Sequence, residues 1–345
     1  MNQNYEIICE YLHLEDVKKR IKPIQDYMKS DCKICKFCGR PESDSLHFRK
    51  KAHVISANVG NRVLTTLDEC DECNEETGII LESDFAKYIQ PLKVVAEVYG
   101  RQNLVKYVDT PNHHRIERKK EGYIDEKLKI KSIIIDTNDE NRMVNSINDF
   151  EGKIKLRRQV YNSYNVYLAL LKMALSTMPK CHMDNFDSSL LRIRAICKGE
   201  LVYRKEKIKD DKLKEGLDDI RKSFPNIGVL EFRPGVDPFG GTGARIYKRI
   251  NECHKNPLYL FQLSFGNYAI YIPVLTDYEL DNQKNMKLSI SSTSSNSSFN
   301  AIDFTKMEEE YICDYITFGK KEIPKEMLPE LSEYLKENGW LDKKQ

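Results

Sequence analysis

The clearest pattern in this chain is a wide apolar face between Tyr164 and Met178. Apolar residues recur there at the three- and four-residue spacing of an α-helix, and Pro179 follows the last of them. The segment therefore predicts a helix that ends at the proline. Similar spacing predicts further helices in four segments, namely 5–29 (one or two helices), 190–201, 212–223 and 326–338.

Short apolar runs of strand length predict a sheet in the second half of the chain. These runs cover residues 127–136, 227–232, 258–265 and 268–275, and we expect residues 154–160 to pair with the first. Gly266-Asn267 between the last two runs predicts a tight hairpin turn. The second half is therefore expected to be a mixed α+β structure.

The first hundred residues show a different order of elements. Residues 46–56 predict a strand that carries His53, and residues 63–67 predict a return strand after a loop. A helix is expected to begin near Cys73 and to continue over residues 85–99, with a break or kink at Pro91.

Length and composition place the chain among globular proteins with two domains. The chain has 345 residues, of which 40% are hydrophobic and 31% charged, and we expect domains at 1–100 and 101–345. No apolar run has the length of a membrane span, and no secretory signal is visible, so a cytoplasmic location is expected. The net charge of +2 argues against binding nucleic acid through a bulk positive field, although Arg49, Lys50 and Lys51 lead directly into His53.

Two Cys-x-x-Cys pairs predict a structural zinc site. Thiolates two residues apart can both face one ion, and two such pairs complete a tetrahedron without an open position for chemistry. The predicted ligands are Cys35, Cys38, Cys70 and Cys73, and Cys32 is an alternative to Cys35. The remaining cysteines are isolated from one another, which is typical of a reducing cytoplasm.

The residues around these cysteines resemble a known family. The order Cys-x-x-Cys, Ala52-His53-Val54-Ile55, Gly60-Asn61 and Cys-x-x-Cys-Asn-x-x-x-Gly is similar to the zinc-stapled branch of the HNH endonucleases, whose active site is a ββα-metal fold. The resemblance covers roughly residues 32–90. It implies a small zinc-bound ββα-metal unit that is preceded by N-terminal helices and followed by the larger α+β domain.

The resemblance also implies a set of active-site residues. His53 would be the general base that deprotonates water, and Asn61 would orient it through the loop. Asn74, directly after the last cysteine, would ligate a catalytic Mg²⁺ or Mn²⁺ ion, for which an amide oxygen is a suitable ligand. The neutral imidazole of histidine suits a general base near pH 7.

One position departs from the family pattern. Many members have an acidic or histidine metal ligand directly before the base, whereas this chain has Ala52. A first interpretation is that Asn74 acts with another group: Glu82, two helical turns after it, or less favoured His47. A second is that the ion binds weakly until DNA adds phosphate oxygens, and a third is that catalysis is lost.

The expected function is a metal-dependent endonuclease that hydrolyses phosphodiester bonds of double-stranded DNA. Defence against foreign DNA, including antiviral defence, follows only by analogy with the family. An HNH unit cuts one strand, so a homodimer is an expected partner, as is an activating ligand or protein bound by residues 101–345. The alternative is a non-catalytic zinc-ribbon adaptor that binds DNA or a protein.

Overall fold

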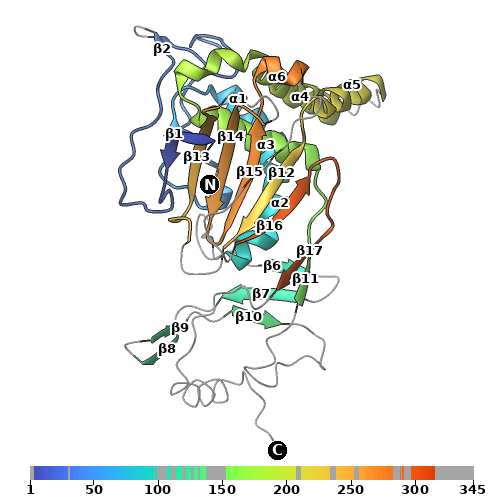
Figure 1. The fold of residues 1–345 in the computed structure, drawn as a ribbon. Helices are drawn as coiled ribbons and strands as arrows, with labels where there is room; N and C mark the ends of the chain where they lie inside the picture. The colour runs from blue at the N-terminus through green and yellow to red at the C-terminus, as the bar shows by residue number, and fades with distance from the viewer. Residues whose placement is uncertain are drawn as a thin grey trace, which may run out of the picture.

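The protein, seen in a computed structural model, contains a six-stranded antiparallel sheet (Figure 1). The structure describes residues 4–29, 32–96, 98, 107–109, 114–118, 122–125, 128–130, 133–136, 153–206, 211–233, 238–251, 256–282, 288, 290 and 297–314. The strand order in the sheet is β1 (Tyr5–Tyr11), β13 (Gly243–Arg249), β14 (Tyr259–Phe265), β15 (Tyr268–Val274), β12 (Ile227–Phe232) and β16 (Ser298–Asp303). The fold is α+β, as the sequence predicts.

The two central strands explain why their sequences read as continuous apolar runs. Every residue of β14 and β15 is buried, so both faces of these strands lie against other parts of the protein. Their hairpin pairs Phe265 with Tyr268 across a two-residue turn, in which Gly266 has a φ of 52°. The predicted strands at 227–232, 258–265 and 268–275 and the predicted turn are confirmed.

Helix α3 (Ser163–Thr177) is the central helix of the fold. It contacts β13, β14 and β15 on one side and α2 (Ser83–Val95) and the π-helical segment η2 (Gly78–Glu82) on the other. The side chain of Asn162 caps its first turn by accepting from the backbone N–H of Tyr164. Because both sides are covered, every residue of α3 except Tyr164 is buried, and the predicted helix is confirmed.

Further helices surround this core at the top of Figure 1. They are η4 (Lys180–Asn185), α4 (Asp187–Glu206), α5 (Asp211–Lys222) and α6 (Asp277–Asp281). The helices predicted at 190–201 and 212–223 are thus confirmed. Within the described ranges, no helix combines the length and apolar character needed to cross a bilayer.

The prediction of helices at the N-terminus is wrong. The described part of residues 5–29 contains β1, the short strand β2 (Met28–Lys29) and turns, but no helix. Strand β1 pairs with β13, which follows it by more than 230 residues. The shift in register between Ile7 and Cys9 is a bulge, and it breaks the alternation that would have identified a strand.

The cysteine-rich segment folds into a hairpin followed by a helix. Short strands β4 (Ala52–His53) and β5 (Thr65–Thr66) pair antiparallel, with the 3-10 turn η1 (Ala57–Val59) between them. Helix α1 (Asp71–Thr77) follows, and the chain stays helical at Gly78 and continues through η2 into α2. Helix α2 also runs through Pro91, where a break or kink was expected, so the chain is not broken there. Strand β3 (Cys32–Lys33) pairs with β2 beside this unit.

The remaining strands lie in small sheets below the main sheet in Figure 1. They are β6 (Tyr107–Asp109), β7 (His114–Arg118), β8 (Gly122–Asp125), β9 (Leu128–Ile130), β10 (Ile133–Asp136), β11 (Lys153–Arg157) and β17 (Glu310–Asp314). Strand β11 pairs with β17, so the expected pairing of 154–160 with 127–136 is wrong. The helix predicted at 326–338 lies outside the described residues.

The hydrophobic core does not stop at residue 100. One cluster of buried side chains has members between Leu14 and Val98 in the first part and members between Tyr161 and Phe304 in the second. The loop before β13 adds a polar link, because Thr242 Oγ1 donates to the Val59 carbonyl at 2.7 Å and Thr242 N donates to Glu15 at 2.8 Å. Gly241, with a φ of 76°, leaves room for that carboxylate, since a Cβ would lie 2.2 Å from Glu15 Oε1.

Candidate functional site

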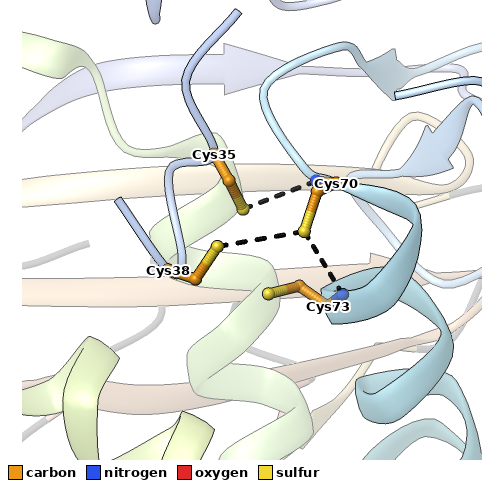
Figure 2. Close-up of side chains that lie close together, drawn as sticks. All are labelled: Cys35, Cys38, Cys70 and Cys73. Carbon is orange, nitrogen blue, oxygen red and sulfur yellow. Dashed lines mark hydrogen bonds between the residues drawn. The ribbon is translucent and has the colours of Figure 1, made fainter. Parts of the chain in front are cut away.

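Four cysteine sulfurs meet between two segments of the chain (Figure 2). Cys35 and Cys38 come from the turn after β3, and Cys70 and Cys73 come from the start of α1. Cys70 is the N-cap of this helix, and its sulfur accepts from the backbone N–H of Cys73 at 3.5 Å. The sulfur of Cys35 accepts from the backbone N–H of Cys70 at 3.4 Å. Backbone N–H groups aimed at sulfur favour the thiolate form that binds metal.

The spacing of the four sulfurs fits a tetrahedral metal ion. All four lie within 4.8 Å of one another, and the sulfurs of Cys38 and Cys70 are 3.9 Å apart. Zinc–sulfur bonds of about 2.3 Å in a tetrahedron place sulfurs about 3.8 Å apart, whereas a disulfide requires about 2.05 Å. The cluster can therefore hold a metal ion such as zinc. The Cys32 sulfur is not in the cluster and contacts the Lys33 carbonyl instead.

Buried polar contacts fix this cluster against α3. Lys36, between the two cysteines of the first pair, donates to the carbonyls of Met178 at 3.1 Å and Ser176 at 3.4 Å. It thereby satisfies backbone acceptors at the C-terminal end of α3. Burial lowers the pKa of Lys36 to about 8, although Asp68 and Asp26 oppose this shift. The turn that carries Cys35 and Cys38 is thus anchored to an element from the second half of the chain.

Asn61 organises the loop that follows His53. Its Nδ2 donates to the carbonyls of Ile55 at 2.6 Å and Leu64 at 2.9 Å, and its Oδ1 accepts from the N–H groups of Val63 and Leu64. These four contacts fix the orientation of the amide, which is 1% exposed. The His53 ring lies beside it, with Nδ1 at 3.5 Å from Nδ2. The Nδ2 group of Asn61 donates mainly to the two carbonyls, which are closer to it than the ring nitrogen of His53 is. Asn61 therefore positions the His53 ring by packing beside it and by fixing the shape of the loop.

A pocket of about 580 Å³ opens beside this loop. It brings together three residues predicted to act in the site, namely His53 from β4, Asn74 from α1 and Glu82 from η2. Asn61 lies behind His53, and His47 is not part of the pocket lining and contacts Arg49 at 3.4 Å. The complete lining consists of Lys50, Lys51, His53, Ala57, Asn58, Asn74, Gly78, Glu82 and Lys93. It combines an imidazole, three side chains with oxygen donors (Asn58, Asn74 and Glu82) and three lysines.

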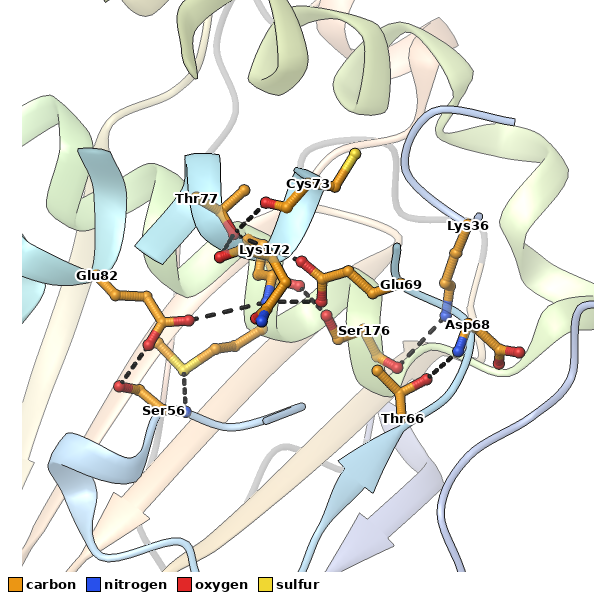
Figure 3. A network of polar contacts seen from close by, with 12 residues as sticks. Lys36, Ser56, Thr66, Asp68, Glu69, Cys73, Thr77, Glu82, Lys172 and Ser176 are labelled. Atoms are coloured by element: carbon orange, nitrogen blue, oxygen red, sulfur yellow. Dashed lines mark hydrogen bonds and ion pairs between the residues drawn. The ribbon is translucent and has the colours of Figure 1, made fainter. Parts of the chain in front are cut away.

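Glu82 is held by two neighbours (Figure 3). Ser56 Oγ donates to its Oε2 at 2.9 Å, and Lys172 Nζ lies 3.8 Å from its Oε1. Lys172 also lies 3.0 Å from Glu69, and this pair is 1% and 0% exposed. Two carboxylates around one ammonium leave an excess of negative charge. Burial alone would lower the pKa of Lys172, but Glu69 and Glu82 raise it above its ordinary value, whereas burial raises the pKa of Glu69.

Ala52 contributes no group to the pocket. Ala52 is fully buried, whereas the next residue, His53, lines the pocket. Successive side chains of a strand point to opposite faces, so Ala52 points into the interior. The charged or amide side chains that bring oxygen atoms to the pocket are Asn58, Asn74 and Glu82, and the Nδ2 group of Asn58 donates to Ser56 Oγ at 3.2 Å. Asn74 and Glu82 are a donor set suited to Mg²⁺, which retains several waters and completes its shell with substrate phosphates.

Reasoning from sequence missed three lysines of this region. Lys36 and Lys172 connect the cysteine-rich segment to α3, and Lys93 lines the pocket. Lys36 was hidden between two cysteines, and Lys93 lay in an apparently ordinary helix. Lys172 carried a signal, because it is a single cation in the apolar run Leu170-Leu171-Lys172-Met173-Ala174. A charged residue within an otherwise buried helix requires a partner, and here the partners are Glu69 and Glu82.

Comparisons with protein families, with curated proteins and with solved structures found no match to this chain.

Proposed function

We propose that this protein is a metal-dependent endonuclease of the HNH type that hydrolyses double-stranded DNA. One observation carries the proposal: an imidazole, a carboxamide and a carboxylate from three elements line a single pocket beside a four-cysteine cluster. The resemblance of the segment 32–90 to HNH endonucleases implies the same roles for His53 and Asn74. Lysines on the same wall add the positive charge that phosphates require.

The residues divide the reaction between them. His53 accepts the proton of the attacking water, and Asn61 keeps the loop and ring in place from behind. Asn74 and Glu82 would hold a Mg²⁺ or Mn²⁺ ion, which supplies positive charge for the scissile phosphate and the leaving oxygen. Lys172 and Ser56 hold Glu82 in its position. Cutting both strands would require a second copy of the unit, because one unit attacks one phosphate at a time.

Plasmid nicking tests this proposal most directly. We expect the wild-type protein to convert supercoiled plasmid to the nicked form with Mg²⁺ or Mn²⁺ but not with EDTA. His53→Ala should reduce the rate by about 10²- to 10⁴-fold, the usual contribution of a general base. His47→Ala is the matched control, since this histidine lies in the same segment but outside the pocket lining. Unchanged zinc content in both variants would show that the fold is intact.

Cleavage by His53→Ala at the wild-type rate would show that His53 is not the general base. Glu82→Gln and Asn74→Ala should raise the Mn²⁺ concentration needed for half-maximal rate, because each removes an oxygen donor or its charge. No such shift would mean that the ion is held elsewhere.

A second function, a non-catalytic zinc-ribbon adaptor, has one specific observation in its favour. Ala52 is fully buried and offers no ligand where the family often has one, while Glu82 already contacts Ser56 and Lys172. Binding of DNA without cleavage under any divalent ion, with unmodified and methylated substrates, would favour the adaptor over the enzyme.

A further inference from the structure

Lys93 is a half-buried cation on the wall of the pocket. It lies in the last turn of α2 and lines the pocket together with His53, Asn74 and Glu82. Across the described part of the chain, its amine has no hydrogen-bond or ion-pair partner. Burial lowers the pKa of Lys93 below its ordinary value of 10.5, and no carboxylate opposes the shift. Partial burial therefore disfavours the charge that this residue carries.

The neighbouring lysines have their charges compensated in other ways. Lys50 lies 3.0 Å from Glu75, and both side chains are more than half exposed. Lys51 is exposed, so water solvates it. Lys172 is enclosed by two carboxylates. Lys93 differs from all three, because it combines partial burial with the absence of a described counter-charge.

We propose that Lys93 binds a backbone phosphate of double-stranded DNA in this pocket, together with Lys50 and Lys51. The choice of DNA rests on the proposed function. The cations come from two separate elements, the segment before β4 and the end of α2, which suits a chain of phosphates better than a single small anion. An arriving phosphate gives Lys93 the counter-charge that the free protein lacks. Its contact therefore contributes more to affinity than that of a solvated surface lysine.

Binding of a fluorescent DNA duplex, measured by anisotropy without added divalent ion, separates this contact from cleavage. Lys93→Met should weaken binding by roughly 10- to 100-fold, the value of one charged hydrogen bond. It should also reduce the slope of log K against log salt by about 0.9, as expected for one lost phosphate contact. Lys93→Arg should retain most of the affinity. Lys222→Met on α5, where the lysine is exposed, controls for the loss of one positive charge.

Thermal unfolding supplies a second and independent readout. Because Lys93 has no described partner, Lys93→Met should be at least as stable as the wild type while it binds DNA more weakly. A lysine needed only for structure would give the opposite result, with lower stability and an unchanged salt slope.

The outcomes distinguish this inference from the proposed function. Salt-dependent DNA binding that Lys93→Met weakens, without nicking by the wild type, would support the phosphate contact and reject the endonuclease. Nicking by the wild type, with Lys93→Met binding DNA at wild-type affinity and slope, would overturn the role of Lys93 alone. No DNA binding by the wild type would overturn both.

Discussion

The buried ion pair between Lys172 and Glu69 makes a sharp prediction about stability. Its Nζ–Oε2 distance of 3.0 Å equals that of the surface pair Lys50–Glu75, so the two pairs differ in burial and in the second carboxylate, Glu82, that lies 3.8 Å from Lys172. At this distance two charges attract by about 1.4 kcal/mol in water and about 5.5 kcal/mol at an effective dielectric constant of about 20. Removing one partner of a buried pair costs about 3–5 kcal/mol, because the other charge is left without compensation.

We therefore expect Lys172→Met to lower the free energy of unfolding by at least about 3 kcal/mol, and Lys50→Met by no more than about 1 kcal/mol. Methionine has nearly the length of the lysine stem, so little volume is lost. Equilibrium urea unfolding followed by circular dichroism measures both values, provided that the zinc content of each variant is unchanged.

The double variant Lys172→Met/Glu69→Gln isolates the charge interaction. It removes both charges and keeps an oxygen for the contact from Thr77 Oγ1, which lies 3.4 Å from Glu69 Oε1. Its stability should return to within about 2 kcal/mol of the wild type, since replacing a whole buried pair is often nearly neutral. If Lys172→Met is no more destabilising than Lys50→Met, or if the second substitution adds a further loss, burial of the pair does not govern its contribution.

Three further predictions concern the metal cluster, the His53 loop and the main sheet. Cys73→Ser should abolish zinc binding, measured by elemental analysis, and lower the melting temperature, whereas the exposed Cys181→Ser should do neither. Asn61→Ala should destabilise the protein by at least about 2 kcal/mol in urea unfolding, because it removes four hydrogen bonds to the backbone of the loop, three of which are buried. Asn58→Ala, beside the same pocket, should cost much less. Burial alone would raise the pKa of Glu231, but hydrogen bonds from Arg233 and Tyr271 hold it below 4.5, so its stabilising effect should be present above that pH and be lost as the pH falls through the lowered pKa. Stability curves of wild type and Glu231→Gln should accordingly converge under acid conditions, and a constant difference across the pH range would contradict the assignment.

Local patterns in the sequence were sufficient where one short segment determines the outcome. Two cysteines three positions apart must lie close together, so the cluster needed only the meeting of two such pairs. Helix α3 and strands β14 and β15 have long uniform apolar runs because both of their sides are covered. His53 and Asn74 were identified through the resemblance to a known family, and they line one pocket with Glu82 because a hairpin and a helix adjacent in sequence carry them.

Features that depend on distant partners were not accessible in this way. The bulge in β1 moved Ile7 to a half-exposed position and left apolar residues at spacings that also fit a helix. Only the pairing with β13 decides between strand and helix there. Strand β13 itself was missed, because Gly243-Ala244-Arg245-Ile246-Tyr247-Lys248-Arg249 carries three cations after a glycine-rich turn. The roles of Lys36 and Lys172 likewise depend on contacts across 140 and 103 positions, respectively.

The anchoring of the cysteine-rich segment to α3 limits how freely this unit can be transplanted. Lys36 donates to the backbone carbonyls at the end of α3, and Glu69 pairs with the ammonium of Lys172. In an excised fragment ending near residue 100, Glu69 would lack the ammonium of Lys172 and Lys36 would lack its two carbonyl acceptors, and apolar surface would lose its cover. Evolutionary exchange or engineering of the unit would therefore have to bring α3 with it, or rebuild both docking positions on a new host.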